Sequence, residues 1–337
     1  MDAPAEPAGT TRFGRTALAK LVVTAALLGV LLARTSPADI AQRLGAVGPG
    51  IVSAAIGLHL LAVLAVGVRW RIVLEELGAA AQVHQAVQFT LVGGFFNQVL
   101  PSGMGGDAFR VWYARGFGLS TGRALASVLV DRIFGLFAIT AIVVAGVPFV
   151  LWMDVPGTFI AAAAAAVTLL VAGIAVFLSL DIFQRPLERA LQRVAPTRLR
   201  GLALRAAAGA AWTARNNRAM LRTWPRGAVA MGISIGCQLL VGFVVYLLLR
   251  SMEQSVALVS VLFLFPFVQL LSMLPISFAG WGLREGAMVV AFRFVGVPAE
   301  VALGASILYG ICLLISSLPG AVIWLALRRR AAGRFSR

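Results

Sequence analysis

Leu100-Pro101-Ser102-Gly103-Met104-Gly105-Gly106-Asp107 interrupts one apolar run of the chain, and Leu274-Pro275-Ile276-Ser277-Phe278-Ala279-Gly280-Trp281-Gly282 interrupts another. Charged side chains follow each break directly: Asp107 and Arg110 after the first, Arg284 and Glu285 after the second. Paired Gly- and Pro-broken segments in the two halves of a membrane protein indicate a binding site near the bilayer midplane. The two breaks therefore predict a membrane protein that handles a ligand inside the bilayer.

The composition of the 337-residue chain excludes an ordinary soluble protein. Hydrophobic residues make up 60% of it and charged residues only 12%, which leaves too little polar surface for a soluble fold. The formal net charge of +16 comes from Arg residues that cluster between apolar runs. Because such clusters mark cytoplasmic loops and attract anionic lipid headgroups, we interpret the charge as membrane topology and expect no nucleic-acid partner.

Apolar runs of about 20 residues predict about six full membrane spans in an all-α polytopic fold. They lie at about Thr16–Ala33, Ile51–Val68, Leu125–Leu151, Phe159–Leu180, Ala228–Leu249 and Val301–Leu327. The first run is similar to a signal peptide, but it is long, contains Lys20 and lacks a good cleavage site, so we expect it to be retained. We predict a disordered tail over residues 1–15, a transmembrane domain over 16–330 and a basic cytoplasmic tail over 331–337.

Charge decides how the two broken stretches, residues 84–118 and 256–297, are threaded through the membrane. The loop over residues 181–226 carries ten Arg against two acidic residues, and the segment from Arg328 carries five more. If both are cytoplasmic, together with the N-terminus, each broken stretch must enter and leave the bilayer on one side. The result is a multi-pass protein of the cytoplasmic membrane with two re-entrant hairpins that approach from opposite faces, an inverted-topology repeat.

A helix that restarts after each break presents unpaired N–H groups and a positive dipole end, which together favour an anion such as phosphate. The breaks themselves are formed by Pro101, Gly105, Gly106, Pro275, Gly280 and Gly282. Arg110 and Arg284, which we expect in the first turn of each restarted helix, would form bidentate contacts with a phosphate. The alternative is that Pro and Gly merely kink packed helices.

Polar side chains beside the breaks have both a structural and a functional interpretation. Asp107 is placed to cap its helix and Glu285 to stabilise the first turn of its own helix; the functional alternative is a counter-ion or a proton-coupling carboxylate. Asn97 precedes the first break, as Gln269 and Ser272 precede the second. These groups would hydrogen-bond either the freed backbone or the ligand, and we weigh the two interpretations equally.

Asp131 and Arg132 interrupt an apolar run, where ionisable groups are costly and usually face a cavity or one another. Arg132 would reach the ligand or Asp107. Asp131 would pair with Arg123 or Arg110. We therefore expect a role in the site for at least one of the two residues.

Metal and cofactor chemistry is not predicted. His59 and His84 have no Cys, His or acidic partner at metal-ligand spacing. Cys237 and Cys312 lie in apolar runs, where we expect them to pack in the core. The sequence has no Walker motif for ATP hydrolysis.

The surface elements carry two further expectations. The Arg-rich loop should form one or two amphipathic helices that bind anionic lipid on the inner leaflet, although orientation by positive charge alone is the simpler explanation. Trp70 and Trp112, each close to an Arg, should anchor the chain at the membrane interface.

Three motifs in order resemble a known family: Asn97 through Arg110, Asp131-Arg132-Ile133-Phe134-Gly135, and Pro275 through Glu285. Over about Leu18 to Arg330 the chain resembles the transmembrane region of lysylphosphatidylglycerol synthases, also called the flippase-like or UPF0104 family. The resemblance implies translocation of a lipid between leaflets around two re-entrant elements. The residues that match the site are Asn97, Asp107, Arg110, Asp131, Arg132, Arg284 and Glu285. Full synthases continue into a soluble transferase domain; because this chain ends soon after its last predicted span, we expect no lysyl transfer from it.

The favoured hypothesis is a flippase for a phospholipid or polyprenyl-type lipid, whose phosphate lies between the two helix N-termini. The alternative from another class is a membrane-embedded transferase acting on a lipid-phosphate donor, with Asp107 or Glu285 as base. The expected external loops, such as residues 34–50, hold only isolated acids, which counts against it. A third hypothesis is an accessory subunit of a lipid-modifying enzyme. Partnership with such an enzyme or with a second copy of the chain stays open.

Overall fold

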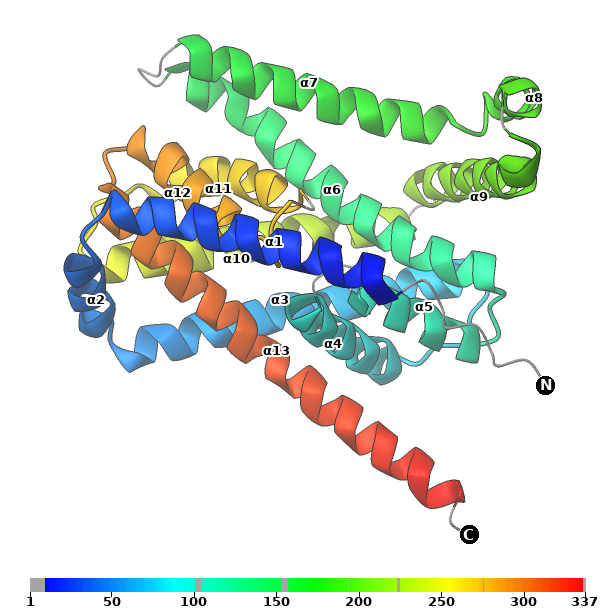
Figure 1. Cartoon of the computed structure of the whole chain (residues 1–337), viewed down its shortest axis with the longest axis horizontal. Coiled ribbons are helices and arrows are strands. Elements are labelled where there is room, and N and C mark those ends of the chain that lie inside the picture. Colours follow the sequence, from blue (N-terminus) through cyan, green and yellow to red (C-terminus); the bar gives the residue numbers. More distant parts are fainter. Residues whose placement is uncertain are drawn as a thin grey trace. The chain divides into compact units, whose positions relative to one another are not determined.

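The computed structural model describes residues 10–100, 105–152, 157–194, 196–222, 225–274 and 276–335. Within these ranges the chain forms thirteen helices and no strand (Figure 1). Four helices are long and apolar enough to cross a bilayer: α3 (Pro49–Glu76), α6 (Thr121–Trp152), α10 (Arg226–Ser251) and α13 (Ala299–Phe335).

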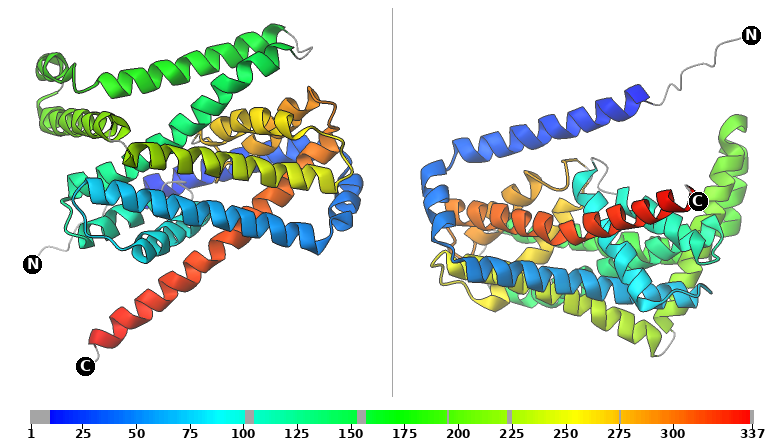
Figure 2. Two further views of the ribbon diagram at one scale, coloured as in Figure 1. Left: turned by 180° about the vertical axis from the view of Figure 1, so that it is seen from behind. Right: turned by 90° about the horizontal axis from the view of Figure 1, so that it is seen from below.

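Two further apolar helices are each followed by a shorter helix at nearly a right angle. Helix α1 (Thr10–Ala33) is bent by 91° from α2 (Pro37–Ala46), and α7 (Gly157–Ser179) is bent by 90° from α8 (Gln184–Val194). Figure 2 shows the turn between α1 and α2 in its right-hand view. Counting each bent pair as one span raises the number of candidate spans to six.

The chain divides into two compact units whose boundaries fall inside helices. Unit 1 holds the described residues up to Leu61, residues 92–106 and the described residues from Val241 onward, and unit 2 holds 62–91 and the described residues of 107–240. Helices α3, α4 (Val83–Val99) and α10 contribute to both units. Helix α5 (Gly105–Gly116) begins in unit 1 and continues in unit 2 from Asp107.

Unit 1 is organised around α13. This helix packs against α2 and α12 (Leu283–Arg293), and α12 also packs against α1 and α11 (Leu258–Ser272). Phe265, Met288 and Leu303 fill the core between these helices, each at most 1% exposed. The second break therefore lies at the turn of the α11–α12 hairpin, where α1 also packs.

Unit 2 is organised around α6 and α9 (Thr197–Arg222). Helix α9 packs against α6, α7 and α8. Its buried face includes Ala207, Ala211 and Ala214, spaced three and four residues apart. Small side chains at this spacing allow helices to approach closely. The central part of the Arg-rich segment is therefore an integral helix of the unit.

The predicted all-α polytopic fold is confirmed, and each of the six predicted spans coincides with a helix: α1, α3, α6, α7, α10 and α13. The helices predicted for the Arg-rich loop are also present, as α8 and α9. Residues Thr10–Arg15, predicted as part of a disordered tail, belong to α1, and α13 continues to Phe335 in the predicted basic tail. The predicted inverted repeat stays a prediction.

The prediction of a loop over residues 34–50 is wrong, because α2 forms there. Ser36 caps this helix by accepting a hydrogen bond from the Asp39 amide at 3.3 Å, and Pro37 occupies the first position. Both features are typical helix-start signals. Ile40 on the inner face of the helix is buried, with 4% of its surface exposed.

Candidate functional site

The first break separates two antiparallel helices. Asn97 near the end of α4 accepts a hydrogen bond from the Gly106 amide at the start of α5, at 2.9 Å. One end of the pair is held there, and further along Phe89 of α4 stacks on Tyr113 of α5 with ring centroids 3.5 Å apart. The chain thus reverses direction at the break, as a re-entrant hairpin requires.

Gly106 is required by this close approach. A Cβ atom at position 106 would overlap the carbonyl oxygen of Gly93 in α4. Asn97 satisfies one of the amides freed at the helix start, which is the backbone-binding interpretation of this residue. Pro101 lies outside the described residues, whereas Gly105 begins α5.

Asp131 is the centre of a buried charge network in unit 2. Its Oδ1 accepts a hydrogen bond from Arg69 Nε of α3, and its Oδ2 accepts one from Arg110 Nη2 of α5, both at 2.7 Å. The three side chains are 2–7% exposed. Arg69 also donates to Ser234 of α10 at 2.8 Å. The network therefore joins α3, α5, α6 and α10.

A second ion pair lies beside it. Arg132 Nε donates to Asp107 Oδ2 at 2.5 Å, and the Arg132 side chain is 41% exposed. The pairings of Arg132 with Asp107 and of Asp131 with Arg110 confirm two of the alternatives read from the sequence. The prediction of Asp107 as the helix cap is wrong, because α5 begins two residues earlier and the carboxylate pairs with α6.

The combined cluster carries excess positive charge. Three arginines, Arg69, Arg110 and Arg132, face two aspartates. Nε of Arg110 is buried and has no hydrogen-bond partner within the described residues. The prediction that Arg110 lies in the first turn of its helix is wrong. Because α5 starts at Gly105, Arg110 lies in the second turn. A buried guanidinium with a donor to spare is a group that an anion stabilises.

Trp70 packs against this cluster. Its ring lies 4.3 Å from the Arg110 guanidinium, and its Nε1 donates to Ser127 at 3.3 Å. The residue is fully buried, so the prediction of an interfacial anchor is wrong for Trp70. Trp112 is 63% exposed, as an anchor would be.

The second break is built on left-handed backbone. Ala279, Gly280 and Gly282 have φ of 48°, 79° and 84°. A Cβ on Gly282 would lie only 2.8 Å from Leu27 of α1. The absence of a side chain at Gly282 therefore also allows α1 to pack closely against the break. Thr24 of α1 accepts a hydrogen bond from the Phe278 amide at 2.9 Å. Pro275 lies outside the described residues.

Arg284 and Glu285 form a closed buried cluster behind this break. Glu285 is fully buried; it accepts from the Gly282 amide at 2.5 Å, from Arg284 at 2.6 Å and from Ser306 of α13 at 3.1 Å. Arg284 lies over the Trp281 ring at 4.7 Å. Both carboxylate oxygens are occupied, which favours the helix-stabilising interpretation of Glu285 over a proton-transfer role.

Residues 17–320 match the protein family described as the lysylphosphatidylglycerol synthase TM region. The chain belongs to this family. The match includes both breaks and both charged clusters, and with the apolar helices it makes the chain a multi-pass membrane protein. A UPF0104 membrane protein of Methanocaldococcus jannaschii is 28% identical over 134 residues, which cover 37% of this chain and 40% of that protein. The chain therefore matches less than half of this relative's length.

In this member of the lysylphosphatidylglycerol synthase TM region family, the predicted site residues fall into two sets. Unit 2 brings Asp107, Arg110, Asp131 and Arg132 together, and unit 1 holds Asn97 at the first break and Arg284 with Glu285 at the second. Arg69 was not predicted, because the span expected to end at Val68 continues as α3 to Glu76. An Arg beside Trp70 is typical of the membrane interface, whereas Arg69 lies about two turns before the end of α3.

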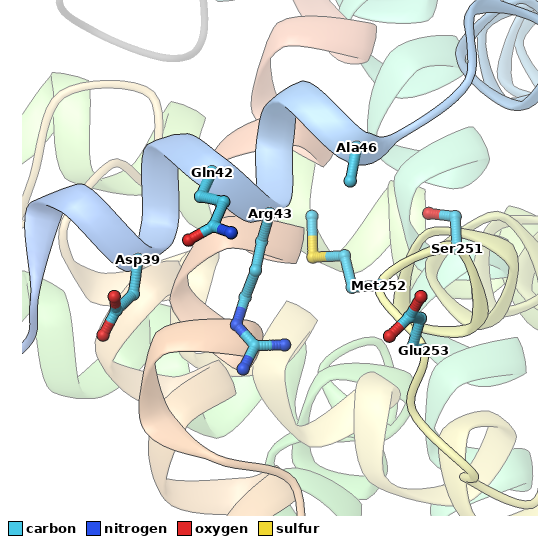
Figure 3. Close-up of a pocket in the computed structure, with 7 residues that line it drawn as sticks. All are labelled: Asp39, Gln42, Arg43, Ala46, Ser251, Met252 and Glu253. Carbon is cyan, nitrogen blue, oxygen red and sulfur yellow. The ribbon is translucent and has the colours of Figure 1, made fainter.

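Other polar features of this family member lie apart from these clusters. Ser277 Oγ within the second break and Gln269 Oε1 before it are buried without a hydrogen-bond partner among the described residues. An open cavity of about 330 Å³ in unit 1 is lined by α2 and the turn after α10 (Figure 3). It contains none of the predicted site residues. No group of three or more metal-binding side chains occurs in the part of the chain that the structure describes.

Proposed function

We propose that this protein moves a phosphate-bearing lipid between the leaflets of the cytoplasmic membrane, with both termini on the cytoplasmic side. The headgroup phosphate would bind at the unit 2 cluster, first at the partly exposed Arg132 and then at Arg110. The single observation that carries the proposal is the excess positive charge of this cluster, in which the buried Nε of Arg110 has no hydrogen-bond partner among the described residues.

The physical need for such a site is the desolvation cost of a charged headgroup. An unshielded charge in the hydrocarbon region costs several kcal/mol or more, roughly 3 on insertion scales and about 10 in simulations. A guanidinium that already lies in the membrane region offers charge-assisted hydrogen bonds in place of water. Because the two carboxylates offset only part of the arginine charge, the cluster accommodates one further anion.

Membership of the family supports a function that involves membrane lipid, since its description names a lipid-modifying synthase. The family name alone does not separate transport from transfer. The carboxylates proposed as catalytic bases, Asp107 and Glu285, are both engaged in ion pairs. A transporter uses such carboxylates to hold arginines in place, which agrees with these contacts better than a base does.

The proposal is tested by lipid exchange in liposomes that contain the purified wild-type protein. Fluorescent lipids with identical acyl chains carry either a phosphate headgroup or a hexose without phosphate, and a membrane-impermeant quencher reports the fraction that crosses. We expect protein-dependent exchange of the phospholipid and little of the glycolipid. Equal exchange of both lipids, or none above protein-free liposomes with folded protein, would contradict the proposal.

A further inference from the structure

The two helices of the Arg-rich segment use their basic residues differently. On α9, Arg215 Nε lies 3.9 Å from the Asp181 carboxylate, and Arg218 donates a hydrogen bond to the same carboxylate. Asp181 lies at the turn between α7 and α8, and its side chain is only 9% exposed. These two arginines therefore hold the turn against α9.

Helix α8 carries the opposite arrangement, an outward row of three arginines. Arg185, Arg189 and Arg193 are all exposed and are spaced four residues apart. This spacing places them within about 80° of one another around the helix axis. None of the three forms an ion pair with the described residues. The acid of this helix, Glu188, accepts a hydrogen bond from Gln184.

The direction of α8 follows from α7. The 23 residues of α7 extend about 34 Å at 1.5 Å per residue, enough to cross a hydrocarbon core of about 30 Å. Leu169 and Val176 on α7 are 74% and 64% exposed, as lipid-facing side chains would be. Because α8 turns by 90° from α7 (Figure 1), it runs along the membrane surface when α7 crosses the bilayer.

Apolar side chains are exposed at the turn itself. Ile182 and Phe183 are 62% and 59% exposed, directly before the first arginine of α8. An exposed apolar pair beside a basic row is the composition of helices that lie at the boundary of headgroups and acyl chains. Water is a poor environment for the pair and a good one for the arginines, so the interface satisfies both.

We propose that α8 is a docking helix for anionic lipid, with Arg185, Arg189 and Arg193 on the headgroups of the leaflet at the end of α7. Helix α9 supports it through the pairs with Asp181. A basic residue near an anionic surface favours the bound state by about fivefold, so three favour it by roughly 100-fold. The effect decreases with salt, since the charges are exposed.

The test follows the depth of α8 in lipid nanodiscs. Gln192, exposed beside the arginine row, is replaced by Cys and labelled with a fluorophore, while Cys237 and Cys312 are buried and react slowly. Quenching by a lipid-borne nitroxide is compared in phosphatidylcholine alone and mixed with phosphatidylglycerol. We expect stronger quenching in the anionic mixture and its reversal by salt.

Two charge-matched variants locate the effect. Arg185→Gln with Arg189→Gln and Arg193→Gln should abolish the difference between the two lipid mixtures. Arg329→Gln with Arg334→Gln and Arg337→Gln removes the same charge from the C-terminal segment and should preserve it. Equal quenching of the wild type in both mixtures would overturn the proposal, and so would equal loss in both variants. The readout does not depend on lipid transport.

Discussion

Arg69 in α3 and Asp131 in α6 form a buried ion pair with 2.7 Å between Nε and Oδ1, although 62 residues separate them in the chain. The other oxygen of Asp131 accepts from Arg110 of α5. One carboxylate thus holds two guanidiniums, and the positive charge is not fully offset. The residues that join the helices of unit 2 are therefore the same ones that carry its excess positive charge.

Removing Arg69 should destabilise the protein strongly. Arg69→Leu leaves Asp131 paired with Arg110 alone and removes the guanidinium that donates to Ser234. Loss of one member of a buried ion pair costs about 3–5 kcal/mol. Arg71→Gln is the matched control, because Arg71 pairs with Glu75 on the half-exposed side of the same helix, where such a pair contributes about 0.5 kcal/mol. Thermal unfolding in detergent distinguishes the two, and similar melting temperatures for both variants would contradict the structural role of Arg69.

The two ion pairs of the cluster should differ in strength. A double-mutant cycle with Asp131→Asn and Arg110→Gln should give a coupling of about 2 kcal/mol or more, because both side chains are buried. The cycle with Asp107→Asn and Arg132→Gln should give less than about 1 kcal/mol, because the Arg132 side chain is 41% exposed. Unfolding in denaturant measures both couplings; the reverse order would show that exposure does not govern them.

The first break should tolerate no side chain at Gly106. Gly106→Ala brings a Cβ onto the carbonyl oxygen of Gly93, and backbone offers little room to relax, so we expect a loss of roughly 2 kcal/mol or more. Gly94→Ala lies on the same helix as Gly93 and meets nothing within 4 Å, so helix propensity should leave it neutral or up to about 1 kcal/mol more stable. Melting temperatures of the two variants test this contrast, which would vanish if α4 and α5 packed elsewhere.

Glu285 should be needed for stability. Glu285→Gln leaves the 5% exposed Arg284 without a charged partner, at a cost of about 3 kcal/mol. Glu253→Gln is the control, since Glu253 is exposed. Size-exclusion profiles and melting temperatures should show a less stable Glu285→Gln and a normal Glu253→Gln; an unchanged Glu285→Gln would remove the basis for the helix-stabilising role.

The apolar spans and the breaks could be predicted from sequence because both depend on local patterns. Runs of apolar residues define the spans, and the Gly-rich segment before Asp107 marks a helix start that the structure confirms at Gly105. The ion pairs Arg110–Asp131 and Arg132–Asp107 were also among the pairings predicted from the sequence. A charged side chain within an apolar run needs a partner, and few charged residues lie close enough in the chain.

Arg69, Trp70 and α2 were missed for a different reason. An Arg and a Trp at the end of an apolar run look the same in sequence whether they face lipid headgroups or a partner 62 residues away. Only tertiary contacts bury Trp70 and give Arg69 its carboxylate. The α2 start signals at Ser36 and Pro37 were local and readable, but short polar segments between spans are usually loops.

The most direct test of headgroup binding at the unit 2 cluster is the rate of phospholipid exchange in liposomes for two single variants. Arg132→Gln removes the partly exposed arginine of the cluster, and Arg115→Gln removes an exposed arginine from α5 outside it. Both variants lose one charge and should stay folded. We predict that Arg132→Gln slows exchange about tenfold or more, as loss of a charge-assisted contact of about 1.5 kcal/mol would, while Arg115→Gln exchanges at the wild-type rate. Wild-type exchange by Arg132→Gln, or equal slowing of both variants, would contradict binding at this cluster.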